Sequence, residues 1–128
     1  PKDIENGQVV VVRRDTREKI VVAIDEITTK LSEILETIQK DLYAKAKAFL
    51  DDHISSAVTM DEMKDAVSEK KGFVKAMWCG DEACEDEIKA QTGGVTSRCI
   101  PMEEEHLSDV CICCGKPAKH MVYWGRAY

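Results

Sequence analysis

The residues of this chain whose types and spacing can do chemistry are its six cysteines. All of them fall in the last 50 of its 128 residues: Cys79, Cys84, Cys99, Cys111, Cys113 and Cys114. Cysteine thiolates are the usual ligands of structural zinc. A disulfide framework is instead typical of short secreted chains that begin with a signal peptide, and residues 1–4 show no signal-peptide pattern. The sequence therefore predicts a metal site.

Two cysteine pairs supply the predicted ligands. The first pair is Cys79 with Cys84, and the second is Cys111 with Cys114. The second pair has the Cys-x-x-Cys-Gly form of a zinc knuckle, in which backbone N–H groups face the first thiolate and the glycine permits a left-handed turn. Cys113 stays an alternative, because a Cys-x-Cys pair with Cys111 also reaches one metal.

Four thiolates fill a tetrahedral site and leave no position for water or substrate, so we expect one structural Zn²⁺ per chain. Such an ion would support the small core of a domain of about 70 residues. A catalytic deaminase site needs a Glu two residues after a ligand, whereas Glu85 follows Cys84 directly. We expect Cys99, which lies inside an apolar strand pattern, to be an ordinary buried thiol.

The elements that position these cysteines form a small α+β domain, expected over residues 58–128. Thr59 and Glu62 have the spacing of a capping box, which predicts a short helix that ends at Gly72. Hydrophobic patterns and paired glycines predict the remaining elements. These are a strand over 73–79, a helix over 82–91 and strands over 95–100 and 119–124.

The preceding residues, 1–57, form the other expected domain. The β-branched run 8–12 predicts a strand buried on both faces, and 20–24 predicts a second strand after a charged turn. From Asp25, a plausible N-cap, apolar residues recur every three or four positions to about His53. This period predicts a long amphipathic helix packed on its own domain, with a coiled-coil partner as the alternative.

Composition limits the classes of function. The net charge is -6 and charged residues make up 33%, which fits a soluble cytoplasmic protein and argues against coating nucleic acid, DNA included, or a membrane by bulk charge. No apolar run approaches the ~20 residues that span a bilayer. The chain starts at Pro1 without Met, so we expect a piece of a longer protein.

Several motifs together resemble a known family. They are the segment 12–19 (VRRDTREK), the segment 79–89 (CGDEACEDEIK), and the ending 114–128 (CGKPAKHMVYWGRAY). In this order they look like the C-terminal part of prolyl-tRNA synthetase of the archaeal and eukaryotic type. The resemblance implies that residues 1–24 are an α/β remnant of an anticodon-binding domain, from which the long helix leads, and that the C-terminal domain is the family's zinc domain.

The resemblance also implies what the whole protein does. It would be a homodimeric class II ligase that joins L-proline to its tRNA using ATP and Mg²⁺. The catalytic domain would lie upstream and is absent here, so this chain alone should have no ligase activity. A stand-alone zinc-stabilised interaction module, docking through its long helix, is the alternative. No catalytic constellation supports an independent enzyme.

Two further expectations concern tRNA and the active site. Arg13, Arg14, Arg17 and Lys19 are four cations within seven residues, suited to contact phosphates and unpaired bases of an anticodon stem-loop. Members of the family commonly carry Gly where this chain has Arg17. The resemblance places the terminal Tyr128 near the synthetase active site.

Overall fold

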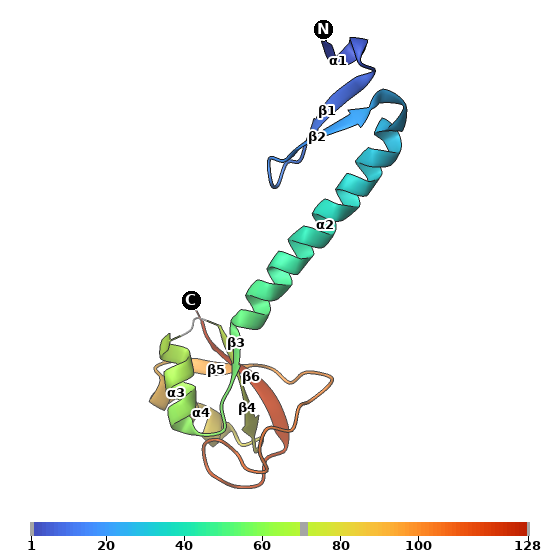
Figure 1. The fold of residues 1–128 in the computed structure, drawn as a ribbon. Helices are drawn as coiled ribbons and strands as arrows, with labels where there is room; N and C mark the ends of the chain where they lie inside the picture. Colours follow the sequence, from blue (N-terminus) through green and yellow to red (C-terminus); the bar gives the residue numbers. More distant parts are fainter. Residues whose placement is uncertain (1, 70–71, 128) are drawn as a thin grey trace. The chain divides into compact units, whose positions relative to one another are not determined.

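The computed structural model describes residues 2–69 and 72–127 (Figure 1). It divides into two compact units, Pro1–Phe49 and Leu50–Tyr128, which are described separately below. This division falls inside a helix, and the predicted domains 1–57 and 58–128 stay a prediction. Within the described ranges, no helix combines the length and the apolar character needed to cross a membrane.

The first unit begins with a short helix, α1 (Lys2–Glu5), and an antiparallel hairpin of β1 (Gln8–Val12) and β2 (Lys19–Ala23). Both strands are where the apolar runs predict them. The prediction that β1 is buried on both faces is wrong, since Val10 and Val12 are 45% and 49% exposed. The reason is that β1 belongs to a two-stranded sheet, which has too few neighbours to cover both faces.

A single 3₁₀ turn, η1 (Ile24–Glu26), leads into the long helix α2 (Ile27–Asp52). The extent of the helix agrees with the prediction, but Asp25 as its N-cap is wrong. Asp25 lies inside the 3₁₀ turn, and the N-cap of that turn is Ala23, whose side chain makes no capping bond. The N–H of Ile27 is instead satisfied by the carbonyl of Ile24, as in other helices that start with 3₁₀ geometry.

The prediction that α2 packs on its own domain is also wrong for the described residues, because none of the side chains of the helix is buried. Ile34 and Ile38 are half-buried, whereas Leu35 and Leu42 are 65% and 51% exposed. The hairpin is much shorter than the 26-residue helix, so most of the apolar stripe has nothing in the first unit to cover it.

The second unit contains a four-stranded sheet in the order β3-β4-β6-β5. Its strands are β3 (Ile54–Ser56), β4 (Phe73–Trp78), β5 (Val95–Cys99) and β6 (His120–Arg126). β3 runs parallel to β4, and the other neighbours are antiparallel. Sequence patterns predict all of these strands except β3, whose three residues are too few to show a period.

Two helices, α3 (Met60–Glu69) and α4 (Glu82–Thr92), complete this unit. The capping box of α3 is confirmed: the Glu62 N–H donates to Thr59 Oγ1 at 3.2 Å, and the Thr59 N–H donates to Glu62 Oε2 at 3.3 Å. The described part of α3 runs to Glu69, and the two residues before the predicted stop at Gly72 lie outside the described residues. α4 ends as predicted at Gly93, which has φ 67° and so adopts the left-handed conformation of a helix C-terminus.

The core of the unit lies where α3 and α4 meet one face of the sheet. Trp124 of β6 is fully buried there and shares the core cluster with Met63 of α3 and Ile88 of α4. The indole of Trp78 meets that of Trp124 edge-to-face, with ring centroids 6.2 Å apart. Trp78 also packs against the buried cysteines, so the core and the cysteine cluster are continuous.

Candidate metal centre

Four cysteine sulfurs converge at one end of the second unit. The Sγ atoms of Cys79, Cys84, Cys111 and Cys114 all lie within 4.8 Å of one another. Cys79 Sγ is 3.6 Å from Cys84 Sγ and 3.8 Å from Cys114 Sγ. The structure therefore brings together the four residues that the spacing of the two pairs singles out.

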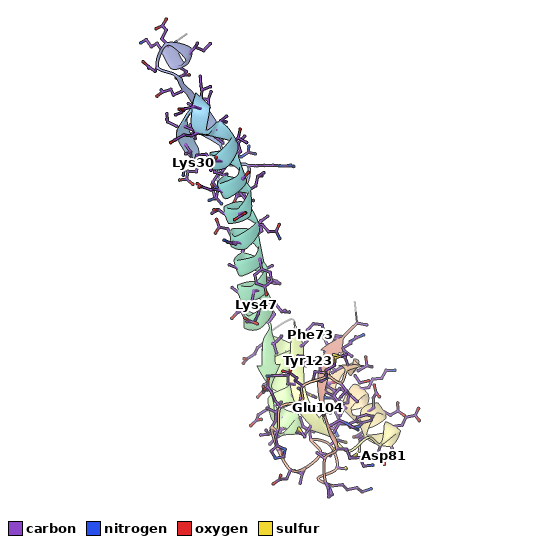
Figure 2. The ribbon with its side chains drawn as sticks, turned by 90° about the vertical axis from the view of Figure 1, so that its right-hand side faces the viewer. Lys30, Lys47, Phe73, Asp81, Glu104 and Tyr123 are labelled. Atoms are coloured by element: carbon purple, nitrogen blue, oxygen red, sulfur yellow. The ribbon has the colours of Figure 1, made fainter. Side chains whose placement is uncertain are left out.

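The first pair is held by the turn between β4 and α4. Asp81 (Figure 2) is the N-cap of α4, and its carboxylate accepts from the N–H of Ala83 at 3.1 Å. Its carbonyl accepts from the indole N–H of Trp78 at 3.2 Å. Cys79 precedes this turn and Cys84 lies in the first turn of α4, so capping fixes the distance between them.

The second pair lies in a tight turn of the segment 111–116. The Gly115 N–H donates to the Cys111 carbonyl at 3.0 Å, and Gly115 has φ 69°, as a zinc-knuckle turn requires. The Ile112 N–H donates to the carbonyl of Met77 in β4 at 3.0 Å. This bond places the second turn directly against the strand that leads to the first.

The spacing of the sulfurs fits a metal ion better than disulfides. A tetrahedral site with metal–sulfur distances of about 2.3 Å has sulfur–sulfur edges of about 3.8 Å. The separations of Cys79 Sγ from Cys84 Sγ and from Cys114 Sγ, 3.6 and 3.8 Å, agree with that edge. A disulfide would need about 2.05 Å, and all six cysteines are free thiols. These four cysteines could hold one metal ion.

Burial and backbone donors act on these thiols in opposite directions. Burial raises the pKa of Cys79 and of Cys84 above the usual value for a thiol. A backbone hydrogen bond from Lys116 lowers the pKa of the exposed Cys114 to about 7. The knuckle turn thus favours a thiolate at Cys114, while the buried pair needs a cation nearby to ionise.

The two remaining cysteines lie outside the set of four. Cys113 is half-buried and packs beside the cluster, and burial raises the pKa of its thiol. Cys99 is exposed, so its prediction as a buried thiol is wrong. It stands at the end of β5, after an irregularity in the pairing with β6 at Ser97 and on the edge of the sheet.

The basic turn between β1 and β2 divides its cations into two kinds. Arg13 is buried, at 8% exposure, and its guanidinium bonds to carboxylates. Arg14, Arg17 and Lys19 are exposed. Arg17 has φ 66°, a left-handed conformation that costs a residue with a side chain about 1–2 kcal/mol and that a Gly adopts freely. Tyr128 lies outside the described residues.

Sequence inspection did not identify Asp41, which accepts a 2.6 Å hydrogen bond from Arg13. Asp41 is one of several carboxylates along an exposed helix, and no motif sets it apart from them. Only the fold shows that it faces the basic turn.

The fold and the cysteine cluster together define a small α+β domain built around a site that could hold a metal ion. Comparison with known proteins supplies the family. Residues 60–128 match the family described as "Prolyl-tRNA synthetase, C-terminal", and the chain belongs to this family. The predicted resemblance to the C-terminal part of prolyl-tRNA synthetase is thereby confirmed, while the archaeal and eukaryotic type stays a prediction.

Curated relatives agree over the whole chain. It is 60% identical to a proline–tRNA ligase of Lachnospira eligens, 60% identical to one of Agathobacter rectalis and 57% identical to one of Clostridium novyi, and each alignment covers 100% of this chain. The chain spans only 26%, 27% and 27% of those relatives. They are therefore much longer than this chain.

Proposed function

We propose that this chain is the C-terminal part of a proline–tRNA ligase, a cytoplasmic homodimeric class II enzyme that joins L-proline to its tRNA with ATP and Mg²⁺. The observation that carries the proposal is the identity of 60% to a proline–tRNA ligase along the full chain. The catalytic domain belongs to the portion outside this chain. Tyr128 is proposed to lie near the active site of the whole enzyme.

We further propose that Cys79, Cys84, Cys111 and Cys114 hold one structural Zn²⁺. Four sulfur donors that all lie within 4.8 Å of one another favour zinc among the metals that proteins commonly bind. When bound, the ion stabilises the four thiolates and links the start of α4 to the turn after residue 110. The cysteine side chains themselves are positioned by the capping carboxylate of Asp81 and by Gly115.

We propose that the basic turn between β1 and β2 contacts tRNA. Arg14, Arg17 and Lys19 are exposed, and within the described ranges they form no ion pair with an acidic side chain. Exposed cations without a protein partner are suited to bind RNA phosphates. Arginine also stacks on unpaired bases, which an anticodon loop presents.

Replacing these three cations tests the tRNA contact. We expect Arg14→Ala, Arg17→Ala and Lys19→Ala each to weaken binding of a proline-tRNA transcript, because each removes a phosphate contact. Each change should lower the slope of log affinity against log salt by about 1. Fluorescence anisotropy of the labelled transcript at several salt concentrations measures both quantities.

The matched control is Lys64→Ala, which removes a partly exposed cation of α3 in the other unit, where it pairs with Asp61. It should leave the affinity and the salt slope unchanged. If all four variants lost the same affinity, the net charge of the chain would explain the effect, and a specific contact by the turn would be contradicted. If the wild-type chain does not bind the transcript, the tRNA role fails.

One observation favours a second candidate, a zinc-stabilised interaction module that docks through α2. Three large apolar side chains of that helix, Leu35, Leu42 and Tyr43, are 65%, 51% and 66% exposed. Exposed apolar side chains gathered on one helix are typical of a surface that binds a partner. Absence of tRNA binding, together with a bound zinc, would favour this candidate over the first.

A further inference from the structure

The Arg13 side chain is surrounded by carboxylates from two elements. Its Nε donates to Asp15 Oδ1 at 3.1 Å and its Nη2 to Asp15 Oδ2 at 2.7 Å, the paired geometry in which arginine binds a carboxylate most strongly. Nη2 also donates to Asp41 Oδ2 at 2.6 Å, and Nη1 lies 3.9 Å from Glu18 Oε2. Only 9% of the side chain is exposed.

Because of these contacts, the acidic side chains of the basic turn face Arg13. Both acidic residues between positions 13 and 19, Asp15 and Glu18, are directed at Arg13. The hydrogen bonds from Arg13 hold the pKa of Asp15 below its usual value, so this carboxylate stays ionised and paired. Arg14, Arg17 and Lys19 are exposed, and the only acidic side chain largely exposed among residues 13–19 is that of Glu18, at 59%.

The bond to Asp41 attaches the turn to α2. Asp41 is 28 residues away in sequence and lies on a long regular helix, whereas the turn has no regular structure of its own. The Arg13 N–H donates to the Glu18 carbonyl at 2.8 Å and the Arg17 N–H to the Arg13 carbonyl at 3.0 Å. Arg13 thus closes the turn through its backbone and attaches it to the helix through its side chain.

We propose that Arg13 is a positioning residue that holds the exposed cations of the turn against α2 through Asp41, and that it does not itself contact tRNA. The inference rests on the proposed tRNA role of this chain and divides the four cations predicted from the sequence into one anchor and three contacts. A guanidinium that already bonds two carboxylates and is nearly buried has little surface to offer a phosphate.

The decisive variant is Asp41→Asn. It removes a negative charge next to the cations, so electrostatics alone predicts tighter RNA binding. Loss of positioning predicts the opposite, a decrease in affinity for the proline-tRNA transcript of about threefold to tenfold. The matched control is Glu36→Gln, which removes the same charge from an exposed position of the same helix and has no ion-pair partner among the described residues.

Two further readouts separate positioning from general destabilisation. Trypsin should cut the turn of Asp41→Asn faster than that of wild type, while the melting of the second unit, followed by tryptophan fluorescence, stays unchanged. Asp41→Glu, which keeps the charge, should restore most of the affinity. Arg13→Gln should lower the affinity without lowering the salt slope.

Tighter binding of Asp41→Asn, matching Glu36→Gln, would overturn the proposal, as would a salt slope that falls by about 1 in Arg13→Gln. If the wild-type chain binds no transcript, the proposed tRNA role fails by itself. The rate of tryptic cleavage then still decides whether Asp41 holds the turn: faster cleavage supports the anchor, and unchanged cleavage rejects it.

Discussion

Cys111→Ser is expected to unfold the second unit, Leu50–Tyr128, and to abolish zinc binding. Cys111 is 2% exposed, the most buried of the clustered cysteines. A hydroxyl is a far poorer ligand for zinc than a thiolate. Structural zinc supplies about 10–16 kcal/mol in small zinc peptides, as much as the roughly 5–15 kcal/mol that keeps a whole domain folded.

Both tryptophans of the chain, Trp78 and Trp124, lie in this unit, so their fluorescence reports its unfolding directly. Thermal melting and zinc content are measured on the same samples. Cys99→Ser is the matched control, because Cys99 is exposed and outside the cluster, and it should melt like wild type. Cys113→Ser should keep its zinc as well, if Cys114 is the fourth ligand. A Cys111→Ser protein with native melting would contradict the structural role.

The second large effect is expected from Trp124→Ala. The side chain is fully buried between the sheet and the helices, and replacing a buried tryptophan with alanine costs about 3–5 kcal/mol. This cost approaches the stability of a small domain, so the variant should be largely unfolded at moderate urea concentrations. Urea titration followed by circular dichroism gives the change in the free energy of unfolding.

Trp124→Phe refines this prediction. The indole Nε1 of Trp124 is buried without a hydrogen-bond partner among the described residues, so Phe keeps most of the apolar contact and removes an unsatisfied donor. Its cost should be clearly smaller than that of alanine. Phe73→Ala is the control, because Phe73 (Figure 2) is 39% exposed and its ring meets that of Tyr123 edge-to-face near the surface. A Trp124→Ala loss no larger than that of Phe73→Ala would place the core elsewhere.

The parts of the fold that could be predicted are those that depend on residues close together in the sequence. The reciprocal bonds between Thr59 and Glu62, and the left-handed Gly93, depend on residues a few positions apart, so the sequence shows the start of α3 and the end of α4 clearly. The strands β4, β5 and β6 are long enough to show a pattern. β3 is too short for that and forms because it pairs with β4, a contact between residues 19 positions apart, Ile54 and Phe73.

Burial was harder to predict, because it depends on what lies opposite a residue in space. Val10 and Leu35 have the pattern of core residues and are exposed, since the first unit contains too little chain to cover them. Cys99 has the setting of a buried strand residue, and its place on an edge strand exposes it. Arg13 shows the reverse, since a cation of a charged turn is buried by carboxylates.

The candidate metal site was predictable for a different reason. The spacing of Cys111, Cys114 and Gly115 is itself the geometry of the knuckle turn, so two of the four sulfurs are placed by local sequence alone. Meeting the other pair, Cys79 and Cys84, requires the sheet, because β4 carries one turn and accepts a hydrogen bond from the other. Among the described residues, the group of sulfurs that lie within 4.8 Å of one another contains Cys114 and not Cys113, a distinction that the spacing of the cysteines alone leaves open.

The most direct test of the zinc-centred account is the zinc content of the native chain, measured together with its reactive thiols after purification under reducing conditions. We expect one zinc per chain, four thiols protected from a thiol reagent until the protein is denatured or chelated, and two reactive thiols, Cys99 and Cys113. No bound metal, together with six reactive thiols in the folded protein, would contradict the proposal that four cysteines hold one structural zinc.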